Sequence, residues 1–146
     1  MAEATTNQLR VRLVTPERVL FEELADAVEL PSKSGYMEAL YGHAPLLAEL
    51  GAGDVTLHGG AGDGQVYNVS WGFVEILPDR VTILANDALK PEEIDVTRAE
   101  KQLDRGLKEW KEAGESEAAY DEAIRVITEA EAKIASAQKK PAGATH

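Results

Sequence analysis

The residues best suited to metal or nucleophilic chemistry are sparse: three histidines and no cysteine stand in a chain of 146 residues. His43, His58 and His146 are far apart in the sequence, and none stands at metal-ligand spacing from another histidine or from a pair of carboxylates. Without cysteine the chain has no thiolate metal site, iron–sulfur cluster, disulfide or cysteine nucleophile. We therefore expect no metal site.

Motifs of catalysis are also missing. The sequence contains no G-x-S-x-G elbow, Walker loop or dinucleotide fingerprint. His43 stands at a loop entry, where it could act as a base but where histidine more often bonds a backbone carbonyl. Four glycines within residues 59–64 are typical of a hairpin tip, since no Gly-Lys-Ser/Thr follows to make a phosphate loop. We expect no catalytic residues and no enzyme activity, although a site on sandwich loops is kept as a third hypothesis.

One group of charges stands out. Arg98, Lys101, Arg105 and Lys108 are spaced 3, 4, 3, which places them along one face of a helix. We call these four residues the basic stripe. It is either a solvated face, supported by i,i+4 pairs with nearby acids, or a docking strip for an acidic partner or an anionic ligand.

The overall charge favours protein partners. The chain carries 26 acids against 15 bases, a net charge of −11. This excess disfavours nucleic-acid binding, which depends on Lys and Arg contacts to phosphate. No apolar run reaches the roughly 18 residues of a membrane span, and the first residues, MAEATTNQLR, lack a signal peptide's pattern. We expect a soluble, intracellular protein.

Short alternating runs fill residues 1–89 and predict half-buried strands. Pairs two residues apart are typical of them, as in Val55 and Leu57, Tyr67 and Val69, and Val74 and Ile76. Turn residues separate the runs, among them Gly51–Asp54 and Pro78-Asp79. This spacing predicts a β-sandwich or barrel with antiparallel strands over residues 1–89.

Beyond Pro91 the spacing of apolar residues changes to that of helices. Two series spaced 3, 4, 3, 4, 3 are separated by Gly114-Glu115-Ser116, where Gly114 can end one helix and Ser116 can cap the next. The series predict an antiparallel helical hairpin over 90–138 and a disordered tail over 139–146. The first series is Val96, Ala99, Leu103, Gly106, Trp110 and Ala113; the second is Tyr120, Ala123, Ile127, Ala130, Ile134 and Ala137. The fold class is therefore α+β.

Several motifs, in order, resemble the epsilon subunit of F-type, proton-translocating ATP synthases. The blocks are Val14-Thr15-Pro16-Glu17 with Phe21, Gly42-His43-Ala44-Pro45-Leu46-Leu47, Val69-Ser70-Trp71-Gly72-Phe73-Val74-Glu75-Ile76 and Val81-Thr82-Ile83-Leu84-Ala85. Trp71 replaces a glycine usual in the family. The segment Ile94-Asp95-Val96-Thr97-Arg98-Ala99 is similar to the motif that binds ATP in some bacterial members.

The resemblance implies a noncatalytic rotor subunit that couples c-ring rotation to ATP synthesis. The sandwich would bind the gamma subunit and the c-ring, with Tyr36, Glu38, Tyr41, Gly42 and His43 as rotor-contact candidates. The hairpin would extend into the alpha/beta assembly and inhibit ATP hydrolysis, using the basic stripe. No cofactor is required; ATP as a regulatory ligand would be bound by Ile94, Asp95, Arg98 and Ala99.

The implied location is peripheral, on the cytoplasmic face of a bacterial inner membrane. The alternative from another class of protein is a free-standing adaptor, whose sandwich and hairpin bind unrelated protein partners.

Overall fold

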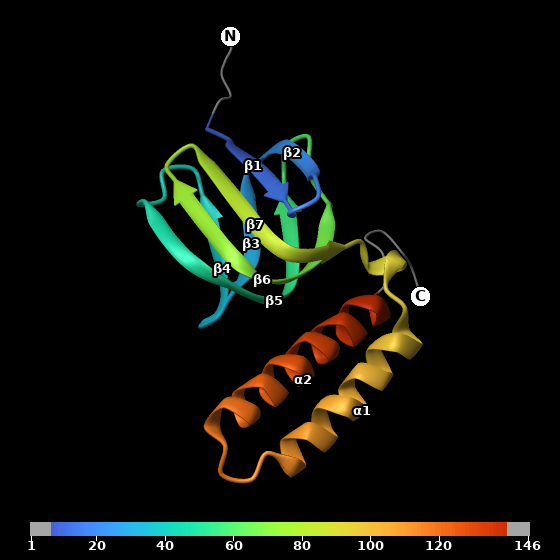
Figure 1. The fold of residues 1–146 in the computed structure, drawn as a ribbon. Helices are drawn as coiled ribbons and strands as arrows, with labels where there is room; N and C mark the ends of the chain where they lie inside the picture. The colour runs from blue at the N-terminus through green and yellow to red at the C-terminus, as the bar shows by residue number, and fades with distance from the viewer. Residues whose placement is uncertain (1–6, 140–146) are drawn as a thin grey trace. The chain divides into compact units, whose positions relative to one another are not determined.

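A computed structural model describes residues 7–139, which form two compact units that separate after Leu89. The strands lie between Leu9 and Leu89 and the helices lie beyond Lys90, as the change of period predicts. Most of the predicted tail, residues 140–146, lies outside the described residues. Each unit is described separately (Figure 1).

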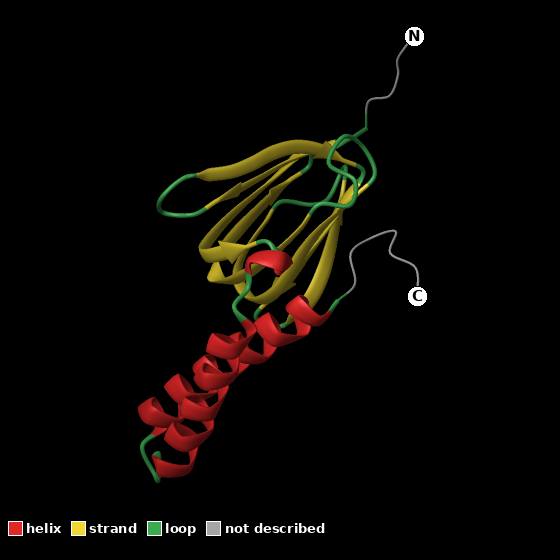
Figure 2. Ribbon diagram, turned by 90° about the vertical axis from the view of Figure 1, so that its right-hand side faces the viewer, coloured by secondary structure: helices red, strands yellow, loops and turns green. Residues whose placement is uncertain are grey.

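The first unit is a seven-stranded sheet that folds over on itself into two layers (Figure 2). Its spatial order is β2-β1-β7-β6-β5-β3-β4. Every neighbouring pair is antiparallel except β1 and β7, which run parallel. The strands are β1 (Leu9–Val14), β2 (Val19–Ala25), β3 (Ala27–Ser32), β4 (Gly35–Leu40), β5 (Leu46–His58), β6 (Val66–Leu77) and β7 (Arg80–Leu89).

One apolar core lies between the two layers. Its fully buried side chains come from alternate positions of the strands, as period-two burial requires. The largest are Leu9, Leu13, Leu30, Leu50, Leu57, Ile76 and Ile83. Phe21 and Tyr67 pack together in this core, with ring centroids 5.5 Å apart. Burial of these side chains, at about 1.5–3 kcal/mol each, is the main term that stabilises the sandwich.

In three long strands, the alternation of core-facing and outward-facing residues changes phase at one shared row. In β6, Tyr67 and Val69 face the core before the row, whereas Val74 and Ile76 face it afterwards. β5 and β7 change in the same way. On one side of the row, Ala52, Ser70 and Asp87 are register partners across β5, β6 and β7. On the other side, the register partners are Leu50, Gly72 and Ala85. We call this row the fold line, because each of the three strands there passes from one phase of burial to the other.

Glycine and strained backbone mark the fold line. Trp71 has φ 61°, and it is the non-glycine residue with positive φ among residues 7–139. Gly72 follows with φ 134°, and a Cβ there would overlap the carbonyl oxygen of Leu84. A Cβ on Gly51 would lie 2.8 Å from the carbonyl oxygen of Ser32. The change of phase therefore depends on residues without side chains at two of these positions.

The second unit is a helical hairpin. A single 3-10 turn (Pro91–Glu93) leads into α1 (Val96–Glu112), and α2 (Glu117–Gln138) returns antiparallel to it (Figure 1). As predicted, Ser116 caps α2 by accepting a hydrogen bond from the Ala119 N–H at 3.2 Å. Gly114 takes the left-handed conformation after α1, with φ 58°.

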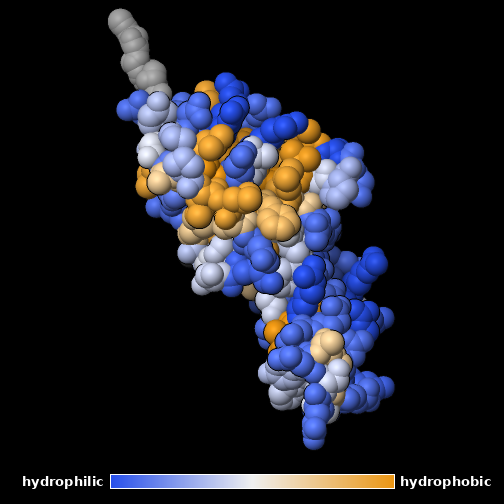
Figure 3. All heavy atoms as spheres, turned by 60° about the vertical axis from the view of Figure 1, so that its left-hand side comes forward, coloured by the Kyte–Doolittle hydropathy of each residue, from blue (hydrophilic) through white to orange (hydrophobic). Residues whose placement is uncertain are grey.

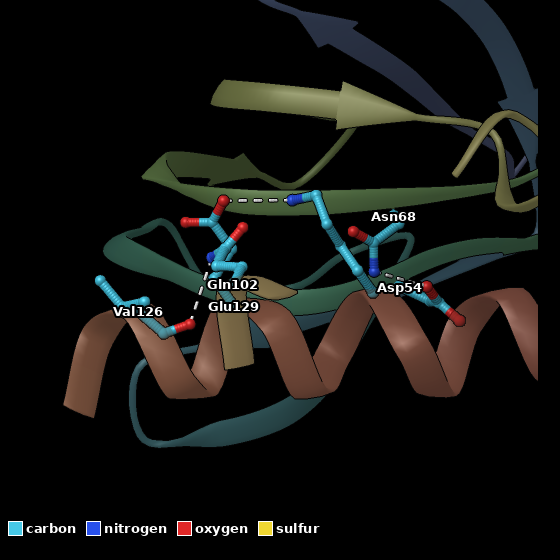
Figure 4. Close-up of polar contacts among 6 residues, drawn as sticks. Asp54, Asn68, Gln102, Val126 and Glu129 are labelled. Atoms are coloured by element: carbon cyan, nitrogen blue, oxygen red, sulfur yellow. Dashed lines mark hydrogen bonds and ion pairs between the residues drawn. The ribbon is translucent and has the colours of Figure 1, made fainter. Parts of the chain in front are cut away.

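Small residues bring the two helices close together. Gly106 is buried, and a Cβ there would lie 2.8 Å from Ile127 Cγ1 and 3.0 Å from Val126 Cγ1. One hydrogen bond crosses at the same level, from Gln102 Nε2 to the Val126 carbonyl at 3.2 Å (Figure 4). Trp110 and Tyr120, predicted in the seam, are 43% and 45% exposed, with ring centroids 6.5 Å apart. They lie near the connection between the helices, where few side chains can cover them.

Candidate functional site

The loop after β4 holds three of the five rotor-contact candidates. Gly42, with φ 89°, donates its N–H to the Pro78 carbonyl at 2.7 Å, which ties this loop to the β6–β7 turn. The His43 N–H donates to the Leu40 carbonyl at 3.1 Å. His43 Nδ1 lies 2.6 Å from the Ala44 carbonyl, so the imidazole is engaged in a local backbone bond. The loop presents an exposed Tyr41 beside a half-buried imidazole.

The other two candidates stand on β4 itself. Glu38 is in register with Glu29 of β3, and Glu29 lies 3.6 Å from His58 Nε2. Tyr36 is near the far end of the strand, where its hydroxyl is bonded to the backbone of β5. Thus the structure brings Tyr41, Gly42 and His43 together, and it places Tyr36 at the opposite end of β4.

The residues of the ATP-motif candidate divide into two pairs. Asp95 is the N-cap of α1, and its Oδ1 accepts a hydrogen bond from the Arg98 N–H at 3.1 Å. Ile94 and Ala99 are buried. The Arg98 guanidinium is exposed and makes no ion pair with residues 7–139. The exposed guanidinium, one turn after the capping carboxylate, remains available to an anionic ligand.

All four residues of the basic stripe are exposed along α1. Arg105 makes one i,i+4 ion pair, with its Nε 3.8 Å from Glu109 Oε2. Such an exposed pair is worth about 0.2–1 kcal/mol and leaves most of the positive charge free for a partner. The stripe is therefore a solvated face in this structure and remains a candidate docking strip.

Two polar side chains of the hairpin were missed by the sequence analysis. Gln102 bonds across the seam, and Lys133 is buried with its Nζ 3.2 Å from Glu129 Oε2 (Figure 4). The Glu129–Lys133 spacing of i,i+4 was the available indication in the sequence. In the sandwich, Asn68 Nδ2 donates to Asp54 Oδ1 at 3.2 Å, and both side chains are buried.

The part of the chain that the structure describes contains no group of three or more His, Asp or Glu side chains placed to hold a metal ion. Over residues 7–139, neither helix has the length and apolar character needed to cross a bilayer.

Comparison with known proteins matches both units. The sequence profile of the family described as ATP synthase, Delta/Epsilon chain, beta-sandwich domain covers residues 8–91. A protein of Solibacter usitatus named ATP synthase epsilon chain is 40% identical over 134 residues, which span 90% of this chain and 97% of the relative. One of Koribacter versatilis with the same name is 41% identical over 104 residues, 70% of this chain and 71% of the relative.

Solved structures share the fold. A chain of the Euglena gracilis mitochondrial ATP synthase, in a structure of its OSCP/F1/c-ring, superposes with a TM-score of 0.75 at 21% identity and covers 91% of this chain and 83% of its own. A chain from the central stalk and c-ring structure of the Tetrahymena thermophila enzyme gives 0.65 at 13% identity, covering 92% of this chain and 100% of its own.

Proposed function

The chain belongs to the family of ATP synthase epsilon subunits, and we propose that it couples rotation of the c-ring to ATP synthesis as part of the central stalk. It is a noncatalytic, peripheral subunit of the catalytic sector. The observation that carries the proposal is the match to the Solibacter usitatus relative, because it extends through the sandwich and most of the hairpin. The adaptor and enzyme hypotheses have no support in these comparisons.

The sandwich is the unit proposed to bind the gamma subunit and the c-ring. Hydrophobic residues gather on one side of it, whereas the hairpin in the same view is mostly hydrophilic (Figure 3). Such a concentration of exposed apolar side chains is typical of a protein-binding surface. We propose that the loop of Tyr41, Gly42 and His43 lies at the rotor contact, with Glu38 on β4 and Tyr36 at the opposite end of that strand as further contacts.

The hairpin is the proposed regulator of ATP hydrolysis. Its seam is built from small residues such as Ala99, Gly106 and Ala130, which bury little apolar area. A hairpin held this weakly can exchange its contacts for those of another surface at a cost of a few kcal/mol. In the proposed inhibited state it extends into the alpha/beta assembly, where the basic stripe meets acidic segments.

We further propose that regulatory ATP binds at the start of α1. Arg98 supplies a guanidinium for phosphate, and Asp95 supplies a carboxylate that also caps the helix. Ile94 and Ala99 fix this turn by being buried. ATP bound there would favour one position of the hairpin. We also propose that the subunit lies at the cytoplasmic face of a bacterial inner membrane, held there through its rotor partners.

Co-purification tests the central proposal. The full chain, with an affinity tag at its C-terminus, is expressed in the cells of its own organism, and membranes are solubilised in mild detergent. We expect gamma and c subunits to be recovered with the tagged chain together with ATPase activity. Recovery of the tagged chain with other proteins but without gamma and c subunits would support the adaptor and overturn the rotor function.

A further inference from the structure

The outer face of one sandwich layer carries a row of exposed apolar side chains. Phe73, Leu84 and Val14 are neighbours in register across β6, β7 and β1, and Phe73 and Leu84 are 52% and 50% exposed. Leu47, on β5 two positions from the same row, is 71% exposed. Val19 of β2 continues the row beside Val14. The core sides of these strands face the opposite way, so the row is surface rather than core.

Two arginines stand side by side on the same face, four positions from this row along β1 and β7. Arg10 of β1 is the register partner of Arg80 of β7, and both side chains are exposed on the outer face. Neighbouring strands are about 4.8 Å apart, so the two side chains start from adjacent positions, with Arg10 reaching toward Glu22 of β2 on the side of β1 away from β7. Like charges directly opposite one another in a sheet are destabilising. The free protein therefore gains no stability from this pair.

These arginines place positive charge on one face of a unit whose net charge is negative. Residues 1–89 contain 13 acids and 5 bases, and three of those bases, Arg10, Arg12 and Arg80, lie on this face. Glu22 forms ion pairs with two of them, at 3.5 Å from Arg10 and 3.9 Å from Arg12. Arg80 has no carboxylate within ion-pair distance among residues 7–139. A positive group without an ion-pair partner among residues 7–139, on the same face as an apolar row, is complementary to a partner segment that carries both a carboxylate and apolar side chains.

We propose that this face, which we call the arginine face, receives a segment of the gamma subunit that is apolar along the Phe73–Leu84 row and carries a carboxylate between Arg10 and Arg80. The inference rests on the proposed rotor function and adds the chemistry of the surface that the partner must present. In the free subunit the two arginines repel one another. The partner's carboxylate relieves this repulsion on binding, so the pair favours the complex.

Charge reversal at one position separates binding from stability. In the free chain, Arg80→Glu places a carboxylate beside Arg10 and should raise the thermal midpoint. In the complex it places that carboxylate against the partner's own, and should weaken binding by about tenfold or more. Arg80→Ala should weaken binding by about threefold and lower its salt dependence. A residue that only maintained the fold would move stability and binding in the same direction.

The test titrates each full-length variant, labelled with a fluorophore, into the ATP synthase catalytic sector depleted of this subunit, at low and high salt. This sector contains gamma and lacks the c-ring. Lys111→Ala is the matched control, because Lys111 is an exposed base in the last turn of α1, outside the sandwich. We expect its affinity to change less than twofold.

The outcomes distinguish the two proposals. Wild-type binding with unchanged affinity and salt dependence in both Arg80 variants would overturn the arginine face alone. Parallel loss of binding and thermal stability in Arg80→Glu would do the same, as would weakened binding of that variant to isolated c-ring instead of to gamma. Absence of wild-type binding to the depleted sector would overturn the rotor function together with this inference.

Discussion

The hydroxyl of Tyr36, on edge strand β4, accepts a hydrogen bond from the backbone N–H of Asp54 on β5 at 2.8 Å. The bond crosses β3, whose pairing with β5 changes register between Glu29 and Ser32. A Cβ on Gly53 would overlap the same hydroxyl, so the glycine makes room for it. Tyr36 therefore satisfies a backbone donor of the sandwich in addition to its proposed rotor contact.

Removing that hydroxyl should destabilise the sandwich. Tyr36→Phe leaves the partly buried Asp54 N–H without its partner, and we expect the free energy of unfolding to fall by about 1–2 kcal/mol. Urea denaturation of the full chain measures it. Tyr41→Phe is the control, since the Tyr41 hydroxyl makes no hydrogen bond within residues 7–139; it should change stability by less than about 0.5 kcal/mol. Equal effects of the two substitutions would contradict the role given to Tyr36.

The left-handed backbone of Trp71 predicts an inverted preference between glycine and alanine. Trp71→Gly and Trp71→Ala both lose the indole, but only alanine retains the cost of φ 61°. We expect the glycine variant to be more stable by about 1 kcal/mol. At Thr82 on β7, which has ordinary backbone, alanine should be the more stable by about 0.5–1 kcal/mol. Thermal or urea unfolding compares the four variants, and alanine preferred at both positions would contradict the strain.

The close approach at Gly106 predicts that a good helix former there weakens the hairpin. Gly106→Leu gains helix propensity, yet its side chain must displace Val126 and Ile127, at a cost of about 1–3 kcal/mol. Hydrogen exchange of α1 and α2 amides should become faster, while sandwich amides keep their protection. Asp104→Leu adds the same side chain on an exposed position of α1 and should leave the exchange unchanged. Slower exchange in Gly106→Leu would refute the packing argument.

The basic stripe predicts a salt-sensitive inhibition. Changing Lys101, Arg105 and Lys108 together to alanine keeps helix propensity and removes contacts worth about 0.2–1 kcal/mol each. Reconstituted complexes should then hydrolyse ATP faster, with the largest gain at low ionic strength. A chain truncated after Leu89 sets the uninhibited rate. Inhibition that survives the triple substitution but disappears on truncation would leave steric insertion of the hairpin as its cause.

The proposed ATP site predicts a specific dependence on Arg98. Calorimetric titration of the full chain with millimolar ATP should show binding that Arg98→Ala weakens about tenfold, through loss of a charge-assisted bond to phosphate. Lys111→Ala, at an exposed base in the last turn of α1, should retain the wild-type heat. The proposed ATP site would be refuted if wild type gave no heat of binding, or if wild type and Arg98→Ala gave equal heat.

Much of the fold follows from local patterns. The change of period near Pro91 predicts the two units, and Ser116 caps α2 where the sequence placed it. The runs Tyr67, Val69 and Val74, Ile76 both belong to β6, although their alternation differs in phase. A shift in alternation looks the same whether the chain turns or continues through a bend, so period alone could not distinguish them. The parallel pairing of β1 with β7 joins residues some 70 positions apart and has no local sign.

The candidate sites were less predictable for a similar reason. The spacing of the basic stripe predicts its exposed helical face, which the structure contains. The side-by-side placement of Arg10 and Arg80 depends on pairing between strands from opposite ends of the unit. Likewise, Tyr36 reaches Asp54 only because β3 lies between β4 and β5. Contacts of this kind come from sheet order, which a single sequence does not specify.

The fold line has a mechanical consequence. Because β5, β6 and β7 each run unbroken across it, the two layers are joined by three covalent backbones as well as by side-chain packing. A tangential load applied to one layer is then carried into the other along peptide bonds, which do not slip as packed side chains can. Hydrogen bonds between the same three strands continue on both sides of the line and resist their separation. The sandwich is thus built as a single bent plate, stiff in shear, rather than as two plates held face to face.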